Sequence, residues 1–434
     1  VSNNGDTVHV AAGTYVENIN YNGKNIAVLG ENRETTIIDG DSLSNVVRFE
    51  NDENENAVLS GFTLTNGRAV QDYMYGRGGG ICNLSSPTLS DLTIIGNTAL
   101  GGGGGMYIHS TSSSIITDVD IIDNITEAWR GGGIYYYGGN ATLSNMKIIG
   151  NQAGSGGGIG FQGVTDIAMN NIVIAGNTAG GGAGILLNGG NFEFENLTIA
   201  GNISTNGSSG GIMFADNYDL VSELILSNSI VYDNSGDQQI IFEPNTDPHA
   251  ITVTYSNIQG AEDAILTNDN GTVNWGEGNI DADPLFCEAD SGNYHIAGNS
   301  PSSGTGEDGA DMGALGVGCD DIWLPPTIAA IEDTSMDEDS ELSLQLSAES
   351  AQGYQIFFEA ESDTSSVYVY VEDDSLHINL MTDWNGSSEI TVVAYSEFSY
   401  ESNDTASFTL TVNSVDDLPF VDGHILPRNY PEDF

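Results

Sequence analysis

Residues 143–161 of the chain read LSNMKIIGNQAGSGGGIGF. This stretch joins two motifs, an apolar run that ends in Gly150-Asn151 and a glycine triplet that is followed by the apolar residue Ile159. The glycine motif recurs at intervals of 25 to 28 residues, at Gly78–Ile81, Gly103–Met106, Gly131–Ile134, Gly156–Ile159, Gly182–Ile185 and, shortened, Gly210–Ile212. The apolar runs of the other motif end at Asn97, Asn124, Asn151, Asn177, Asn202 and Asn234.

Each repeat contains two or three apolar segments of strand length, separated by Gly, Asn, Ser and Asp, and shows no helical periodicity. This pattern predicts one coil of a parallel β-helix, in which equivalent strands stack about 4.8 Å apart and side chains alternate between interior and solvent. Asparagine at a fixed turn position tolerates the left-handed conformation and can hydrogen-bond along a column of its own kind. The glycine triplets allow tight bends where no Cβ atom would fit.

The repeats resemble those of right-handed parallel β-helix proteins that bacteria secrete or display, including the polymorphic autotransporter adhesins. Residues Gly5–Ile19 resemble the N-terminal coil of pectinesterase-like β-helices within the pectin-lyase-like fold. Residues Asn279–Phe286, Gly292–Gly306 and Asp311–Gly316 resemble the terminal segment of such solenoids. The resemblance covers residues 1–320 and implies an all-β right-handed solenoid. Because relatives carry a capping segment before the first coil, we expect the natural chain to begin upstream of Val1.

The composition excludes several partners. The 434 residues include 62 acidic and only 8 basic side chains, so the formal net charge is −54. Such a surface repels phosphate backbones and anionic headgroups, which argues against nucleic acid and electrostatic membrane docking. The apolar runs are far shorter than the roughly 20 residues that cross a bilayer, so no transmembrane segment is expected. Three cysteines allow one bridge, Cys287 to Cys319, which leaves Cys82 over.

A second domain is predicted at residues 321–417, where glycine becomes scarce and short alternating segments such as Glu341–Ala348 follow one another. About seven short strands in roughly 95 residues are typical of an immunoglobulin-like or cadherin-like β-sandwich. The segment also resembles tandem bacterial surface domains, on the basis of Pro325-Pro326, Glu338-Asp339 and Phe408–Val412.

The end of the chain repeats the start of this domain. Leu324-Pro325 recurs as Leu418-Pro419, and Glu338-Asp339 recurs as Glu432-Asp433, both at an offset of 94 residues. Residues 418–434 are therefore interpreted as a linker and the start of a further tandem sandwich. Such arrays form stalks.

Enzymatic β-helices carry recognisable catalytic elements, and this sequence holds no complete set. The Gly-His-Gly and Arg-Ile-Lys elements of polygalacturonase-like relatives do not occur, and the pectinesterase-like elements are incomplete. A polysaccharide lyase would need a base beside a carboxylate that a cation neutralises. The few basic residues reduce the candidates for this alternative to Arg77, Arg130 and Tyr135, and no catalytic residue is assigned in the preferred interpretation.

Aromatic residues form a better candidate site. If Ile134 points inward, Tyr135 and Tyr137 point outward, as do Tyr107 and His109 on the preceding coil. Trp129 borders the same surface, and aromatic faces with a few polar groups are what a glycan-binding groove needs. The alternative is that these are ordinary outward residues whose rings stabilise neighbouring strands.

Calcium is the expected cofactor, because it takes six to eight oxygen ligands and commonly stiffens the joints of secreted tandem sandwiches. The candidate ligands lie where domains join. They are Asp320, Asp321, Asp337, Glu338, Asp339, Asp416 and Asp417. The alternative is a solvated acidic linker.

Together these features predict a secreted or cell-surface bacterial protein with a structural or adhesive role. A rigid β-helix would stand on a calcium-stiffened sandwich stalk and would bind a glycan or another cell-surface ligand, or self-associate into extracellular fibres. The alternative function is a lyase or related enzyme that degrades an acidic polysaccharide.

Overall fold

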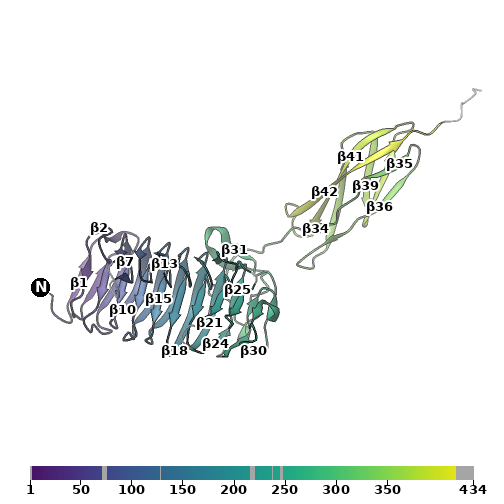
Figure 1. Ribbon diagram of the computed structural model, residues 1–434. Coiled ribbons are helices and arrows are strands. Elements are labelled where there is room, and N and C mark those ends of the chain that lie inside the picture. The colour runs from purple at the N-terminus through teal and green to yellow at the C-terminus, as the bar shows by residue number, and fades with distance from the viewer. Residues whose placement is uncertain are drawn as a thin grey trace, which may run out of the picture. The chain divides into compact units, whose positions relative to one another are not determined.

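The computed structural model describes residues 2–70, 76–127, 129–215, 220–236, 238–244 and 248–416. The chain is all-β and divides into two compact units, Val1–Ile322 and Trp323–Phe434 (Figure 1). The division lies two residues after the boundary expected from the sequence. Asp417 and the predicted third segment, residues 418–434, lie outside the described residues.

The first unit is a parallel β-solenoid of about nine turns, in which equivalent strands of successive coils pair in register. Sheet A, the larger of its two long sheets, contains β1 (Thr7–Val10), β2 (Gly13–Val16), β4 (Ala27–Gly30), β5 (Thr36–Asp39), β7 (Val58–Thr65), β10 (Thr88–Ile95), β13 (Ile115–Ile122), β16 (Thr142–Ile149), β18 (Asp166–Ala175), β21 (Gly190–Ala200), β24 (Ser222–Ser227), β25 (Ile230–Tyr232), β27 (His249–Thr254), β28 (Asn257–Ile258) and β30 (Gly271–Trp275).

Sheet B stacks the strands that follow the glycine triplets, together with the equivalent strands at both ends. It contains β3 (Ile19–Asn20), β6 (Val47–Phe49), β9 (Ile81–Asn83), β12 (Met106–Ile108), β15 (Ile134–Tyr137), β17 (Ile159–Gln162), β20 (Ile185–Leu187), β23 (Ile212–Phe214), β26 (Ile240–Phe242) and β29 (Ile265–Leu266). Two-residue strands pair between the two long sheets. They are β8 (Arg68–Ala69), β11 (Thr98–Ala99), β14 (Ile125–Thr126), β19 (Thr178–Ala179) and β22 (Ile203–Ser204).

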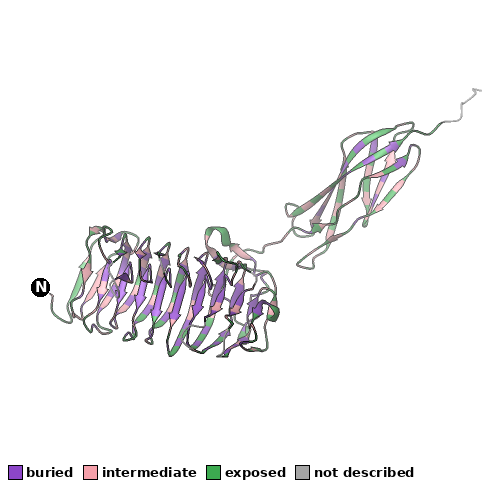
Figure 2. Cartoon of the chain, viewed as in Figure 1, coloured by how far each residue is buried: buried purple, intermediate pink, exposed green. Residues whose placement is uncertain are grey.

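Inward side chains of like shape stack from coil to coil and fill the interior of the solenoid. Figure 2 shows that buried positions recur along the strands of successive coils. In sheet A, Ile94, Ile121 and Ile148 are aligned partners on β10, β13 and β16, and all three are fully buried. In sheet B, Ile134 and Ile159 are aligned in the same way. Truncating one such side chain to alanine typically costs about 2–5 kcal/mol, so the repeated isoleucines are a main source of stability.

The recurring asparagines form a buried ladder, as their spacing predicted. The side-chain amide of Asn124 donates to Oδ1 of Asn151 at 3.0 Å, and that of Asn151 donates to Oδ1 of Asn177 at 3.0 Å. The sequence predicted that the asparagine itself would adopt the left-handed conformation, and this was wrong. The residue before it does so, for example Asp123 (φ 51°) and Gly150 (φ 69°). The asparagine recurs at the same place in successive coils, where its amide satisfies buried polar groups of two coils at once.

The glycine triplets act in two ways. Gly131, the first of its triplet, has φ 70°, which L-residues with a side chain adopt only under strain. Gly132 and Gly133 have no such φ, but a Cβ atom on either would approach a backbone oxygen of the next coil within 2.8 Å. The triplet therefore turns the chain and also lets adjacent coils approach closely.

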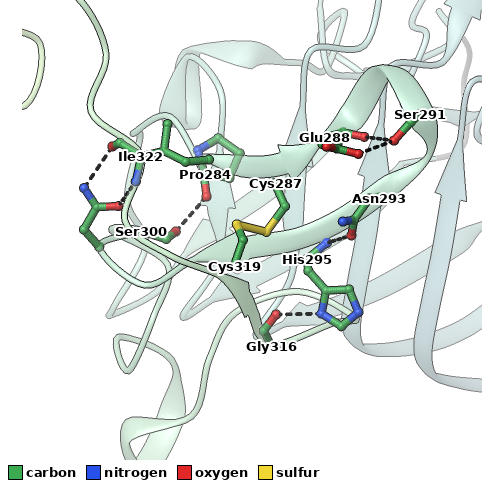
Figure 3. Close-up of a disulfide and its surroundings, with 11 residues drawn as sticks. Pro284, Cys287, Glu288, Ser291, Asn293, His295, Ser300, Gly316, Cys319 and Ile322 are labelled. Carbon is green, nitrogen blue, oxygen red and sulfur yellow. Dashed lines mark hydrogen bonds between the residues drawn. A yellow bond between two sulfur atoms is a disulfide. The ribbon is translucent and has the colours of Figure 1, made fainter. Parts of the chain in front are cut away.

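A C-terminal segment folds back over the outer face of sheet A. It contains β31 (Phe286–Glu288), β32 (Asn293–Ala297) and β33 (Val317–Cys319), and a disulfide joins Cys287 to Cys319 (Figure 3). Tyr294 packs against Val173 and Ala200, which point outward from the sheet. The disulfide closes a loop across 32 residues, which in the chain-entropy account stabilises the segment by about 3–4 kcal/mol.

The second unit contains two main sheets around a separate apolar core that includes Leu376, Ile378, Val392 and Leu410. One sheet has the order β35 (Thr334–Asp337), β42 (Asn403–Asn413), β41 (Gly386–Ser396) and β38 (Ile356–Ser362). The other has the order β36 (Leu342–Gln345), β40 (Ser375–Leu380) and β39 (Val367–Glu372), and a small pair joins β34 (Thr327–Ile328) to β37 (Ala348–Glu349).

Candidate functional site

The aromatic residues singled out in the sequence gather on the outer face of sheet B. Cys82, Tyr107 and Tyr135 are aligned partners on β9, β12 and β15, each one residue after an inward apolar side chain. They pack together in a cluster that is separate from the core of the solenoid. The alternation along each strand therefore brings Tyr107 and Tyr135 together on one face, as predicted.

Arg77 covers this cluster. Its guanidinium carbon lies 5.0, 5.3 and 5.8 Å from the ring centroids of Tyr107, Tyr135 and Tyr137, and Nη1 donates a 2.8 Å hydrogen bond to the Tyr107 hydroxyl. Tyr107 and Tyr135 are consequently buried, with 0% and 1% of their surface exposed. This corrects the expectation that both rings would be open to a ligand: they support the surface from below.

Arg130 has different partners from Arg77, although both precede a glycine triplet. Its Nη1 lies 3.2 Å from Oε1 of Gln162, and the same oxygen accepts a 2.7 Å hydrogen bond from the Tyr135 hydroxyl. Gln162 was not recognised from the sequence, because it follows its triplet by four residues and only the register of β15 and β17 places it beside Tyr137.

The exposed rim of the cluster consists of His109 and Tyr137, whose ring centroids lie 6.2 Å apart. Trp129 is 56% exposed and Tyr137 is 38% exposed, while His109 is partly buried. Beside Tyr137 lies a shallow hollow of about 490 Å³. Its lining residues are Ser110, Tyr137, Gly138, Gln162, Gly163 and Leu220. The surface thus combines ring faces with an amide and a hydroxyl around a concave patch.

The site is almost uncharged at neutral pH apart from its arginines. Burial raises the pKa of Tyr107, against the opposing effect of Arg77. Burial, and then the charge of Arg77, lower the pKa of His109, so its imidazole is neutral at pH 7. Burial also raises the pKa of the free thiol of Cys82 to about 12, which makes it unreactive.

The alternative catalytic set of Arg77, Arg130 and Tyr135 is not arranged for proton abstraction. The Tyr135 hydroxyl is buried and donates to Gln162, and the guanidinium of Arg77 stacks on rings. A catalytic base must come within hydrogen-bond reach of the proton it removes, and a buried hydroxyl with its own acceptor does not. The geometry favours binding over chemistry at this face.

The predicted calcium ligands do not form a metal centre in the described part of the chain, which holds no group of three His, Cys, Asp or Glu side chains able to bind a metal ion. Glu338 is buried, and its carboxylate accepts a 2.7 Å hydrogen bond from the Val415 amide. Asp337 accepts a 3.3 Å hydrogen bond from Asn413. The remaining described candidates are exposed. They are Asp320, Asp321, Asp339 and Asp416.

Comparison with known proteins adds little. No family model matches the chain, and no curated protein sequence matches it. Among solved structures, it is similar to a chimeric titin Z1Z2 functionalized with a KLER exogenous peptide from decorin, at 13% identity over 22% of this chain and all of that one, with a TM-score of 0.17. A likeness of that size carries no argument. Within the residues that the structure describes, no helix has the length and apolar character to cross a membrane.

Proposed function

We propose that the chain is a secreted or cell-surface structural protein that binds a neutral glycan on the outer face of sheet B. The observation that carries the proposal is the partly exposed ring of Tyr137 beside a polar hollow. Sugar rings stack on aromatic faces and direct their hydroxyls to nearby amides, and Gln162 supplies one. The net charge of −54 favours an uncharged ligand over a polyanion.

An extracellular location and a stalk are part of this proposal. The disulfide between Cys287 and Cys319 supports an oxidising compartment, because such bonds are rare in the reducing cytosol. Two sheets around one core support an immunoglobulin-like or cadherin-like sandwich for the second unit. The pectin-lyase-like character of the solenoid rests on the terminal sequence segments, and self-association into fibres stays a prediction that sedimentation analysis checks.

A glycan array followed by calorimetry tests the binding proposal. We expect one class of neutral oligosaccharide to bind, and Tyr137→Ala or Trp129→Ala to weaken binding about tenfold, which corresponds to about 1.4 kcal/mol. The control is Tyr368→Ala, which removes an exposed ring of the second unit and should leave the affinity unchanged. Equal binding by all three variants would refute a site on sheet B.

Calcium binding at the domain junctions stays a prediction as well. Isothermal titration calorimetry of the whole chain with calcium chloride checks it. A saturable heat of binding at micromolar to millimolar calcium is expected if carboxylates and backbone carbonyls complete a site. A flat titration at millimolar calcium would remove this part of the account.

A further inference from the structure

The second unit carries an aromatic surface that the proposed glycan site does not use. Phe357 on β38 and Tyr395 on β41 are aligned cross-strand partners, and their rings stack with centroids 5.9 Å apart. Tyr400, in the loop after β41, meets the Tyr395 ring at 4.8 Å. Phe357 and Tyr400 are 39% and 54% exposed, and a shallow hollow of about 320 Å³ lies among these residues and Phe398.

A carboxylate lies beside the hydroxyl ends of the two tyrosines. Both tyrosine hydroxyls point to Glu359, with Tyr395 Oη 3.4 Å from Oε1 and Tyr400 Oη 3.2 Å from Oε2. The charge of Glu359 raises the pKa of Tyr400, so that phenol stays protonated and neutral under physiological conditions. The surface therefore presents electron-rich ring faces, a fixed negative charge and no positive charge.

The aromatic cluster of the solenoid already contacts a cation from its own chain. There, Arg77 lies over three tyrosine rings at 5.0 to 5.8 Å. Between Trp323 and Asp416 the sequence contains no lysine or arginine at all, so no side chain of the described part of the second unit can fill that role. Ring faces attract cations, Arg most often, and the attraction adds to that of a neighbouring carboxylate.

We propose that this surface docks an arginine-bearing segment of a partner protein, with one guanidinium over the rings of Tyr395 or Tyr400 and beside the carboxylate of Glu359. Charge complementarity selects this occupant over a neutral one, because the described part of the unit, up to Asp416, offers a carboxylate beside the rings and no lysine or arginine. The inference is independent of the glycan site on sheet B, since it concerns other residues in the other unit.

Fluorescence anisotropy with the intact chain tests it, using a labelled peptide of alternating glycine and arginine and the same peptide with citrulline in place of arginine. Citrulline keeps the shape of arginine and removes the charge. We expect saturable binding of the arginine peptide at moderate salt, at least about tenfold weaker binding of the citrulline peptide, and about threefold weakening by Tyr400→Leu, the loss typical of one exposed ring.

Two controls separate a docking site from diffuse attraction to an acidic protein. Tyr368→Leu removes a 65% exposed ring on β39 of the other sheet and should not weaken binding. Glu359→Gln should weaken it about twofold, and Glu372→Gln, an exposed carboxylate on β39, should not. If Tyr400→Leu and Glu359→Gln bind like wild type, the attraction is diffuse and the proposal fails. Equal binding of the citrulline peptide, or of a neutral oligosaccharide at this surface, also overturns it.

Discussion

In the solenoid, three tyrosine rings lie around the guanidinium of Arg77, whereas in the second unit the hydroxyls of two tyrosines lie beside the carboxylate of Glu359. The first cluster supplies its own cation and is largely buried, so most of its aromatic surface belongs to the fold. The second cluster is exposed. The comparison teaches that an outward aromatic residue is open to a ligand only to the extent that other side chains of the same chain leave its ring exposed.

Removing a ring should therefore have very different effects in the two clusters. Tyr107→Ala deletes a fully buried side chain and should lower the free energy of unfolding of the solenoid by about 3–5 kcal/mol. Tyr400→Ala, in the exposed cluster, should change stability by no more than about 0.5 kcal/mol. Urea unfolding followed by near-ultraviolet circular dichroism compares each variant with wild type. If the unfolding midpoint of the solenoid were the same in Tyr107→Ala as in wild type, the first cluster would not be part of the fold.

The cation of the first cluster should matter less than its rings, but measurably. Arg77→Met keeps much of the stem, removes the guanidinium that donates to the buried Tyr107 hydroxyl and removes the contact with the rings, at a cost of about 2 kcal/mol. The matched control is Arg68→Met, because Arg68 is half exposed and lies 3.8 Å from Glu127, a geometry worth less than about 1 kcal/mol. A larger loss at Arg68 in the same unfolding experiment would contradict the account.

Alkaline pH should destabilise the solenoid through the ionisation of its buried tyrosines, and this effect distinguishes them from the exposed Tyr400. Burial raises the pKa of Tyr107, Tyr136 and Tyr21, while tyrosines of the unfolded chain ionise from about pH 10. The unfolded state then binds fewer protons, so stability that is present below pH 10 is lost as the pH rises above it. The pKa of Tyr400 is also raised, by Glu359, but this exposed phenol can ionise without unfolding.

Urea midpoints measured between about pH 9 and pH 11 check this effect. For a single tyrosine, it is the smallest of the stability changes predicted here. The fall of the solenoid's midpoint with pH should be shallower in Tyr107→Phe than in wild type and unchanged in Tyr400→Phe, because Tyr400 belongs to the second unit. Cys82 adds to the same trend, because burial raises its pKa to about 12. A fall of the same steepness in both variants would mean that Tyr107 ionises in the folded solenoid.

The sequence was sufficient for the solenoid, because its fold is encoded by local repeats. The spacing of Asn124, Asn151 and Asn177 predicted the ladder correctly. The prediction placed the left-handed conformation one residue too late, at the asparagine. A repeat pattern shows that both residues recur, but it does not show which one turns the chain and which one satisfies the hydrogen bonds of the turn. Asp123 shows that a non-glycine residue can hold that position.

The site was only partly predictable. Alternation along β12 and β15 placed Tyr107 and Tyr135 on the outer face, but their burial depends on Arg77, which approaches them from a different coil. Gln162 was missed for the same reason, since its contact with Tyr135 joins residues 27 positions apart. Contacts between coils follow from register and side-chain reach, which a repeat pattern does not specify at individual positions.

Equilibrium dialysis of the intact chain against the neutral oligosaccharide selected on the array, with mass spectrometry of the recovered sugar, tests the central claim most directly. The account predicts that the oligosaccharide binds saturably, returns with its length unchanged, and binds about tenfold more weakly to Tyr137→Ala. Recovery of shortened or unsaturated products would contradict a binding surface and favour the enzyme. Undiminished binding to Tyr137→Ala would place the ligand elsewhere.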